Sequence, residues 1–365
     1  MKNRFLLALL CQCFLLTAQQ KEAPVSYTLG ADLFYGSIIL HNTDISHLIT
    51  SHPSGLILAL NRETFGEEAW ESAFNYPDIG YSFIYQDMRN TVLGENYGLY
   101  AHYNFYLLNR ALQFRVGQGI AYNTRPYDRE ENFRNNAYGT SFMSSTYLML
   151  NYQKKGLLGP LGVKAGLSLV HYSNANVKAP NTSTNTFAFN AGLVYDMDHE
   201  LVREYQVTPP GEIDRSMAYN LGFSTGINES DVIGSGQFPF YIFTASAEKR
   251  LGRFSAVHLG TDLFFSNFLK KLIRFQSVSF PELSVDPDTD YKRVGIFAGH
   301  ELYINRMSII TQLGYYVYYP FDFEGRVYNR VGLKRYFGDR YYATLSLKSH
   351  AAKAEAVELG FGIKI

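Results

Sequence analysis

The feature that most constrains the fold is an alternation of apolar and polar side chains with a period of two. The clearest run spans residues 96–108, where Tyr97, Leu99 and Ala101 occupy alternate positions. A period of two is typical of a β-strand whose faces meet two different environments. The chain is therefore expected to be all-β.

Similar runs recur along the sequence, separated by polar residues and turn formers. They predict about 12–16 strands. The runs lie near residues 26–36, 55–63, 78–87, 96–108, 112–122, 143–153, 160–173, 186–197, 217–229, 237–250, 254–266, 293–304, 307–319, 327–337, 340–350 and 354–365.

The lengths of these runs distinguish a membrane barrel from a soluble β-sandwich or propeller. Many runs reach about 10–13 residues, enough for a tilted strand to cross a bilayer, whereas soluble strands average about five or six. Tyr and Phe crowd the ends of the runs, as at residues 315–319. Tight turns such as Asn109-Arg110 alternate with long polar loops near 124–142 and 267–292. These features predict a transmembrane antiparallel β-barrel of the outer membrane of a Gram-negative cell.

The N-terminus has the pattern of a secretion signal. Residues 1–4 supply positive charge, residues 5–16 are apolar, and cleavage is expected near Ala18. Cys11 and Cys13 both fall within this segment, so the mature chain is expected to contain no disulfide.

The mature chain is expected to be one domain. Residues 1–18 are assigned to the signal peptide, and residues 19–365 are predicted to form a single outer-membrane barrel. No internal repeat or shift of composition marks a second domain. Connections near residues 64–77 and 198–215 break the alternation of short and long loops.

Charge and histidine spacing limit the partners. The 33 basic residues balance the 33 acidic ones, so there is no cationic excess to bind nucleic acid. The spacing of His41, His47 and His52 fits no helical metal pair, and neither a metal nor another cofactor is expected. The oligomeric state is left open.

One hairpin places polar residues where strand parity calls for apolar ones. In its first strand the odd-numbered residues of 163–169 are apolar, and the same parity continues onto His171 and Ser173. In the returning strand the odd-numbered residues of 187–195 are apolar, and Asn185 shares their parity. All three polar side chains are therefore expected on the lipid-facing side.

These residue types suit nucleophilic catalysis. A serine hydroxyl becomes a useful nucleophile when a histidine takes its proton, which assigns Ser173 as the nucleophile and His171 as the base. Asn185 is placed to orient the imidazole from the neighbouring strand. The amide of Asn181, in the connecting loop, is a candidate donor to a tetrahedral oxyanion. The expected substrate is an acyl ester held in the membrane.

A family resemblance points to the same chemistry. The stretch His171-Tyr172-Ser173-Asn174-Ala175, followed by Pro180-Asn181 and a polar position at 185, resembles the active-site signature of the outer-membrane lipid A 3-O-deacylase (PagL) family, also known as acyloxyacyl hydrolases. The resemblance is specific over residues 169–195 and looser over residues 122–141.

The resemblance implies roles for individual residues. His171 matches the catalytic base of the family, Ser173 its nucleophile and Asn181 its oxyanion asparagine. The acid of the family falls at Asn185, so an amide replaces the carboxylate. An amide orients an imidazole but adds no charge to stabilise the imidazolium.

Two functions follow. The first is a serine-type esterase that removes an ester-linked acyl chain from lipid A, the lipopolysaccharide anchor in the outer leaflet, without a cofactor. The second is a non-catalytic barrel, either a pore or a lipid-binding scaffold. A second Ser-His-acid group, Ser349 and His350 with Glu355 and Glu358, is interpreted as a polar turn and is the first place to look for a missing carboxylate.

Overall fold

The computed structural model describes residues 25–201, 204–209, 211–351 and 353–365. Within these ranges the chain forms sixteen antiparallel strands, the shortest of nine residues and the longest of 17. The predicted all-β barrel architecture and strand number are confirmed. The expected signal peptide and both cysteines lie outside the described residues.

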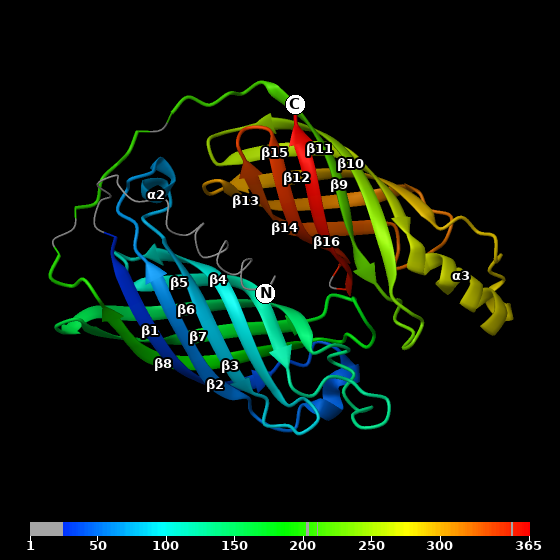
Figure 1. Cartoon of the computed structure of the whole chain (residues 1–365), viewed down its shortest axis with the longest axis horizontal. Coiled ribbons are helices and arrows are strands. Elements are labelled where there is room, and N and C mark those ends of the chain that lie inside the picture. Colours follow the sequence, from blue (N-terminus) through cyan, green and yellow to red (C-terminus); the bar gives the residue numbers. More distant parts are fainter. Residues whose placement is uncertain (1–24, 202–203, 210, 352) are drawn as a thin grey trace, which may run out of the picture.

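The strands close into two barrels that lie side by side (Figure 1). β8 pairs back onto β1, and β16 pairs back onto β9. The N-terminal barrel contains β1 (Tyr27–Ile38), β2 (Ser54–Arg62), β3 (Asp78–Asp87), β4 (Glu95–Leu107), β5 (Leu112–Asn123), β6 (Phe142–Leu158), β7 (Leu161–Ser173) and β8 (Thr184–Asp196). The C-terminal barrel contains β9 (Met217–Asn228), β10 (Phe238–Arg250), β11 (Ser255–Ser266), β12 (Lys292–Tyr303), β13 (Met307–Tyr318), β14 (Val327–Phe337), β15 (Tyr341–His350) and β16 (Lys353–Lys364).

The single barrel predicted over residues 19–365 is therefore wrong. Residues 197–216, one of the two connections that break the loop pattern, join the barrels. Alternation within a strand shows which face meets lipid, but it does not say which strand closes the sheet. The other irregular connection, between β2 and β3, contains the short helix α2 (Ala69–Ala73).

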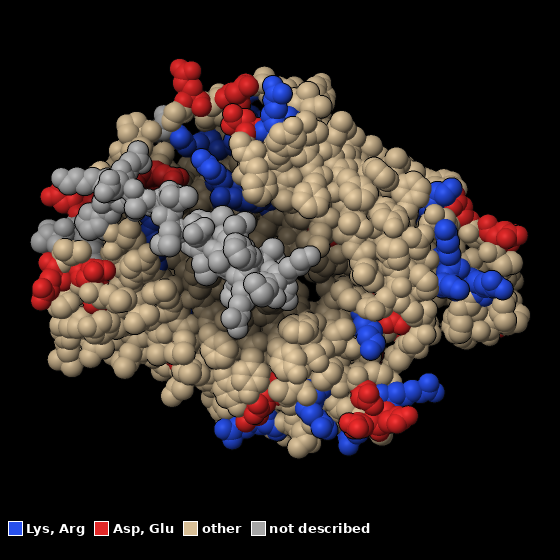
Figure 2. All heavy atoms as spheres, viewed as in Figure 1, with Lys and Arg blue, Asp and Glu red and all other residues tan. Residues whose placement is uncertain are grey.

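The outer face of each barrel is mostly apolar, as contact with lipid requires, and the inner face is mostly polar. Leu33, Tyr81 and Leu99 are exposed on the outside of the N-terminal barrel. Asp32 and Lys164 are buried inside it, with Nζ 2.7 Å from a carboxylate oxygen. A charge on the lipid face costs about 2–4 kcal/mol at the bilayer midplane, so inward pairing is favoured. Figure 2 shows the charged side chains gathered mainly near the ends of the barrels, with broad uncharged surfaces between them.

The lumen of the C-terminal barrel is filled by ion pairs. Arg330 Nη1 lies 3.0 Å from Asp262, and Arg330 Nε lies 2.7 Å from Glu358. Arg293 lies 2.5 Å from Glu355. A cavity of about 60 Å³ lies among these networks. Eight strands enclose a space just wide enough for side chains, which explains the filled lumen.

Contacts at both ends set the two barrels in the same orientation. At the end with short turns, the rings of Phe74 and Phe254 are 4.9 Å apart. At the end with long loops, Glu229 N donates to Asn176 O at 2.9 Å. The long loops of the two barrels therefore open to the same side. The longest of them in the C-terminal barrel contains helix α3 (Asn267–Ser279). No helix of the described chain is long and apolar enough to cross a membrane.

Because no strand is shared between the barrels, cutting the connection should leave both folded. We expect a protease site inserted within residues 204–209 to be cleaved without loss of β-sheet circular dichroism, and each fragment to keep a heat-dependent mobility on detergent gels. Unfolding of either fragment upon cleavage would contradict the two-barrel closure.

Candidate functional site

His171 and Asn185 meet on the outer face of the N-terminal barrel. They are register partners on β7 and β8, and His171 Nδ1 lies 2.7 Å from Asn185 Oδ1. An amide oxygen only accepts, so Nδ1 must carry the proton and Nε2 is left with a lone pair. Nε2 makes no hydrogen bond to any residue in the described ranges. The imidazole is therefore held in the tautomer that a general base needs.

Ser173 ends β7 and is engaged by the following loop instead of by His171. Its Oγ donates to Asn181 Oδ1 at 3.1 Å and accepts from Ala175 N at 2.9 Å. The side chain is only 7% exposed. Among the described residues no hydrogen bond joins Ser173 to His171. The four predicted site residues therefore form two hydrogen-bonded pairs, His171 with Asn185 and Ser173 with Asn181.

The orientation of Asn181 is fixed by the backbone. Its Oδ1 also accepts from Asn174 N at 2.9 Å. Because a backbone N–H needs an acceptor, the carbonyl oxygen of this amide faces the end of β7. The NH2 group has no hydrogen-bond partner within the described part of the chain. It remains a free donor beside Ser173.

A row of polar side chains extends the site around the barrel. Gln118, Thr146, His171 and Asn185 stand in register across β5, β6, β7 and β8. Thr146 Oγ1 donates to Gln118 Oε1 at 2.5 Å. Gln118 and Thr146 were not identified from the sequence. Both occupy positions of outward parity, so the argument used for His171 could have found them.

A loop of the N-terminal barrel supports the returning strand. Thr182 N and Ser183 N donate to Asn136 O and Ala137 O at 3.1 and 3.2 Å. Gly139 lies so close that a Cβ there would come within 2.6 Å of Pro180 O. A residue without a side chain is needed for this approach.

The remaining histidines of the N-terminal loops contact single partners. His41 Nε2 lies 3.0 Å from Thr182 O, His47 Nε2 lies 2.9 Å from Arg134 O, and His52 Nδ1 lies 2.7 Å from Ser37 Oγ. They form no cluster with one another in the described residues.

The second Ser-His-acid group lies in the C-terminal barrel. His350 Nε2 is 2.7 Å from Glu355, which also binds Arg293 and Lys348. Ser349 Oγ accepts from Asn329 instead of from His350. Both oxygens of Glu355 are paired inside this lumen. Glu355 therefore does not supply His171 with the carboxylate that Asn185 replaces.

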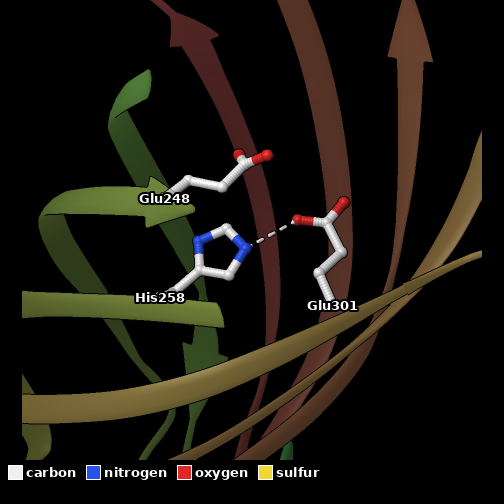
Figure 3. A group of neighbouring side chains, drawn as sticks. All are labelled: Glu248, His258 and Glu301. Carbon is white, nitrogen blue, oxygen red and sulfur yellow. Dashed lines mark ion pairs between the residues drawn. The ribbon is translucent and has the colours of Figure 1, made fainter. Parts of the chain in front are cut away.

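A third titratable cluster, Glu248, His258 and Glu301, lies in the same lumen near the end with short turns (Figure 3). His258 lies between the two carboxylates, 3.1 Å from Glu301. Lys334 Nζ lies 3.0 Å from Glu301, and Lys364 Nζ lies 2.6 Å from Glu248. The ammonium groups of Lys334 and Lys364 balance the charges of Glu301 and Glu248. We therefore interpret this cluster as an ion-pair network.

Two family models match the chain, one for each barrel. The model described as "Lipid A 3-O-deacylase (PagL)" matches residues 54–194. The model described as "Acyloxyacyl hydrolase, C-terminal domain" matches residues 217–365. No curated protein matches the chain.

Solved porin structures were also found. Two mutants of the Rh. blastica porin share 9% identity with the chain, cover 94% of it and 100% of their own length, and superpose with a TM-score of 0.18. A triple mutant of the Rhodopseudomonas blastica porin shares 8% identity at the same coverage and score. Scores this low carry no structural argument, and the architecture rests on the strand pairing.

The geometry predicts the tautomer of His171. Nitrogen-15 NMR of histidine-labelled protein, assigned by comparison with a His171→Ala sample, should show Nδ1 protonated and Nε2 unprotonated. Replacing Asn185 with Ala removes the acceptor, so the population with protonated Nε2 should rise. An unchanged tautomer in Asn185→Ala would contradict the role of this hydrogen bond.

Proposed function

The chain belongs to the lipid A 3-O-deacylase (PagL) family of outer-membrane ester hydrolases, and we propose that His171 and Ser173 carry out the deacylation. The substrate is an ester-linked acyl chain of lipid A in the outer leaflet of a Gram-negative outer membrane. The observation that carries the proposal is the Asn185 hydrogen bond, which leaves Nε2 of an outward-facing imidazole free to accept a proton.

The reaction begins with a change of partner for Ser173. Rotation about its side-chain bond releases Oγ from Asn181 and directs it toward His171. As Oγ attacks the ester carbonyl carbon, Nε2 takes the hydroxyl proton. The carbonyl oxygen becomes an oxyanion, to which the free NH2 group of Asn181 donates.

Collapse of this intermediate breaks the bond between the carbonyl carbon and the lipid A oxygen. The departing alkoxide takes the proton from His171, and the acyl group stays on Ser173 Oγ. Water then attacks the acyl-enzyme with His171 again acting as the base, which releases the fatty acid and restores Ser173.

The placement of the site suits a lipid substrate. Exposed apolar residues such as Phe187 and Phe189 lie on β8 next to Asn185, along the surface that acyl chains contact. The polar row from Gln118 to Asn185 lies near the end with long loops, where a sugar headgroup would be. A lipid A molecule beside the barrel can thus bring its ester to His171 without leaving the membrane.

Asn185 limits the rate in this proposal. It orients the ring but supplies no negative charge when Nε2 is protonated. No carboxylate hydrogen-bonds the ring within the described residues.

A non-catalytic barrel is the competing function. The filled lumens weigh against a pore, since ion pairs and hydrogen bonds occupy the interior of each barrel. A lipid-binding scaffold without activity predicts no change in lipid A on incubation.

Mass spectrometry of lipid A incubated with purified protein tests the proposal. The wild type should remove one acyl chain, and Ser173→Ala or His171→Ala should lower the rate by about 1,000-fold or more. Ser277→Ala, a serine substitution on α3, serves as the matched control and should retain the wild-type rate. Full activity in Ser173→Ala would exclude it as the nucleophile.

Restoring a carboxylate should accelerate the reaction. Asn185→Asp keeps the size of the side chain and adds the charge that stabilises the imidazolium, so kcat should rise by about 10-fold or more. Steady-state rates of the two purified proteins give the comparison. A fall in kcat would show that the amide is suited to this site.

A further inference from the structure

The C-terminal barrel reaches across to the loop that follows Ser173. Residues 229–237, between β9 and β10, lie against residues 174–181, between β7 and β8. Glu229 N donates to Asn176 O at 2.9 Å. Gln237 Nε2 donates to Val177 O at 2.9 Å. Two barrels that share no strand are thus joined at the candidate site.

The carboxylate of Glu229 is the central contact. Its Oε2 accepts from Ala179 N at 2.9 Å, and its Oε1 accepts from Gly236 N at the same distance. The residue is only 3% exposed. Hydrogen bonds from N–H groups to a buried carboxylate are stronger than neutral ones, so this residue ties the two loops firmly together.

The loop depends on this support. Ala175 and Asn176 have φ values of 52° and 65°, a left-handed backbone that costs free energy for residues other than glycine. In the described chain, the hydrogen bonds that leave residues 175–179 for a residue beyond their own loop go to Glu229 or Gln237, apart from the bond of Ala175 N to Ser173 Oγ at the end of β7. The N-terminal barrel contacts the same loop through Ser173, which binds Asn181, and through Gly139, which packs against Pro180. Backbone hydrogen bonds from the 132–137 segment go to the following residues, Thr182 and Ser183.

We propose that Glu229 is a positioning residue, through which the C-terminal barrel holds the 174–181 loop so that Asn181 stays beside Ser173. Ala179, to which Glu229 binds, lies two residues before Asn181. A displacement of the loop by about 1 Å would move the amide donor away from the forming oxyanion and cost rate. The inference rests on the proposed function, and it gives the second barrel a part in the site of the first.

Steady-state kinetics on lipid A test this role. Glu229→Ala should lower kcat by about 10-fold with little change in KM, because Glu229 touches no substrate. Glu229→Gln keeps one acceptor oxygen, so its kcat should lie between those of the wild type and Glu229→Ala. The matched control is Glu282→Ala, an exposed glutamate beyond α3, which should leave kcat unchanged. An unchanged kcat in Glu229→Ala would overturn the proposal.

A double-mutant comparison separates positioning from general support of the fold. If Glu229 acts through Asn181, then Glu229→Ala should cost little further rate in an Asn181→Ala background. If the rate loss of the double variant equals the product of the losses in Glu229→Ala and Asn181→Ala, Glu229 does not act through Asn181. Heat-dependent gel mobility identifies any variant that fails to fold.

Hydrogen exchange provides a test that does not depend on activity. In intact wild-type protein, peptides covering residues 174–181 should be protected, and Glu229→Ala should speed their exchange by about 10-fold. Peptides of β1 should be unaffected. Equal protection in both proteins would overturn the proposal even if deacylation were absent. Conversely, faster exchange with an inactive wild type would count against the proposed function alone.

Discussion

Pairing of the backbone is the constraint on which the rest of this structure depends. Lipid offers no partner for an N–H or C=O group, so a sheet in a membrane must close on itself. This chain satisfies that requirement twice, through β8 with β1 and β16 with β9. Closure after eight strands leaves a narrow interior, which polar side chains such as Asp32 and Lys164 fill in pairs.

Filled lumens leave the outer surface and the loops as the places for chemistry. His171 and Asn185 lie in a short polar row on an outer face that is mostly apolar, where an unpaired polar group is costly. Their hydrogen bond reduces that cost and also sets the tautomer that the proposed catalysis requires. The same contact therefore stabilises the strand pair and, in the proposed mechanism, prepares His171 to act as the base.

The two barrels have unequal parts in the proposed function. The nucleophile and base come from β7 of the N-terminal barrel, while the loop beyond Ser173 is held by Glu229 of the C-terminal barrel. The internal charges of the C-terminal barrel, such as Arg330 between Asp262 and Glu358, are paired among themselves. The C-terminal barrel thus contributes to the proposed site through its loops.

Much of the fold could be predicted from the sequence, because side-chain parity depends on local pattern alone. Parity predicted the strands and placed His171 and Asn185 on one face of neighbouring strands. The point of closure could not be predicted, since the connection 197–216 is as polar as an ordinary loop.

The contacts of Ser173 and Glu229 also could not be predicted. Ser173 contacts Asn181, which lies in the loop between β7 and β8. Glu229 lies in the loop between β9 and β10 and contacts Ala179 of the N-terminal barrel. The path of each loop depends on packing against residues distant in the sequence. The polar residues Gln118 and Thr146 were accessible to the same parity argument that found His171.

Covalent labelling tests the central claim most directly. A fluorophosphonate with a long alkyl chain phosphonylates an activated serine, and the modified peptide can be identified by mass spectrometry. The account predicts a single adduct at Ser173 that is lost in His171→Ala. An adduct at another serine, or a wild-type enzyme that deacylates lipid A while Ser173 stays unmodified, would contradict it.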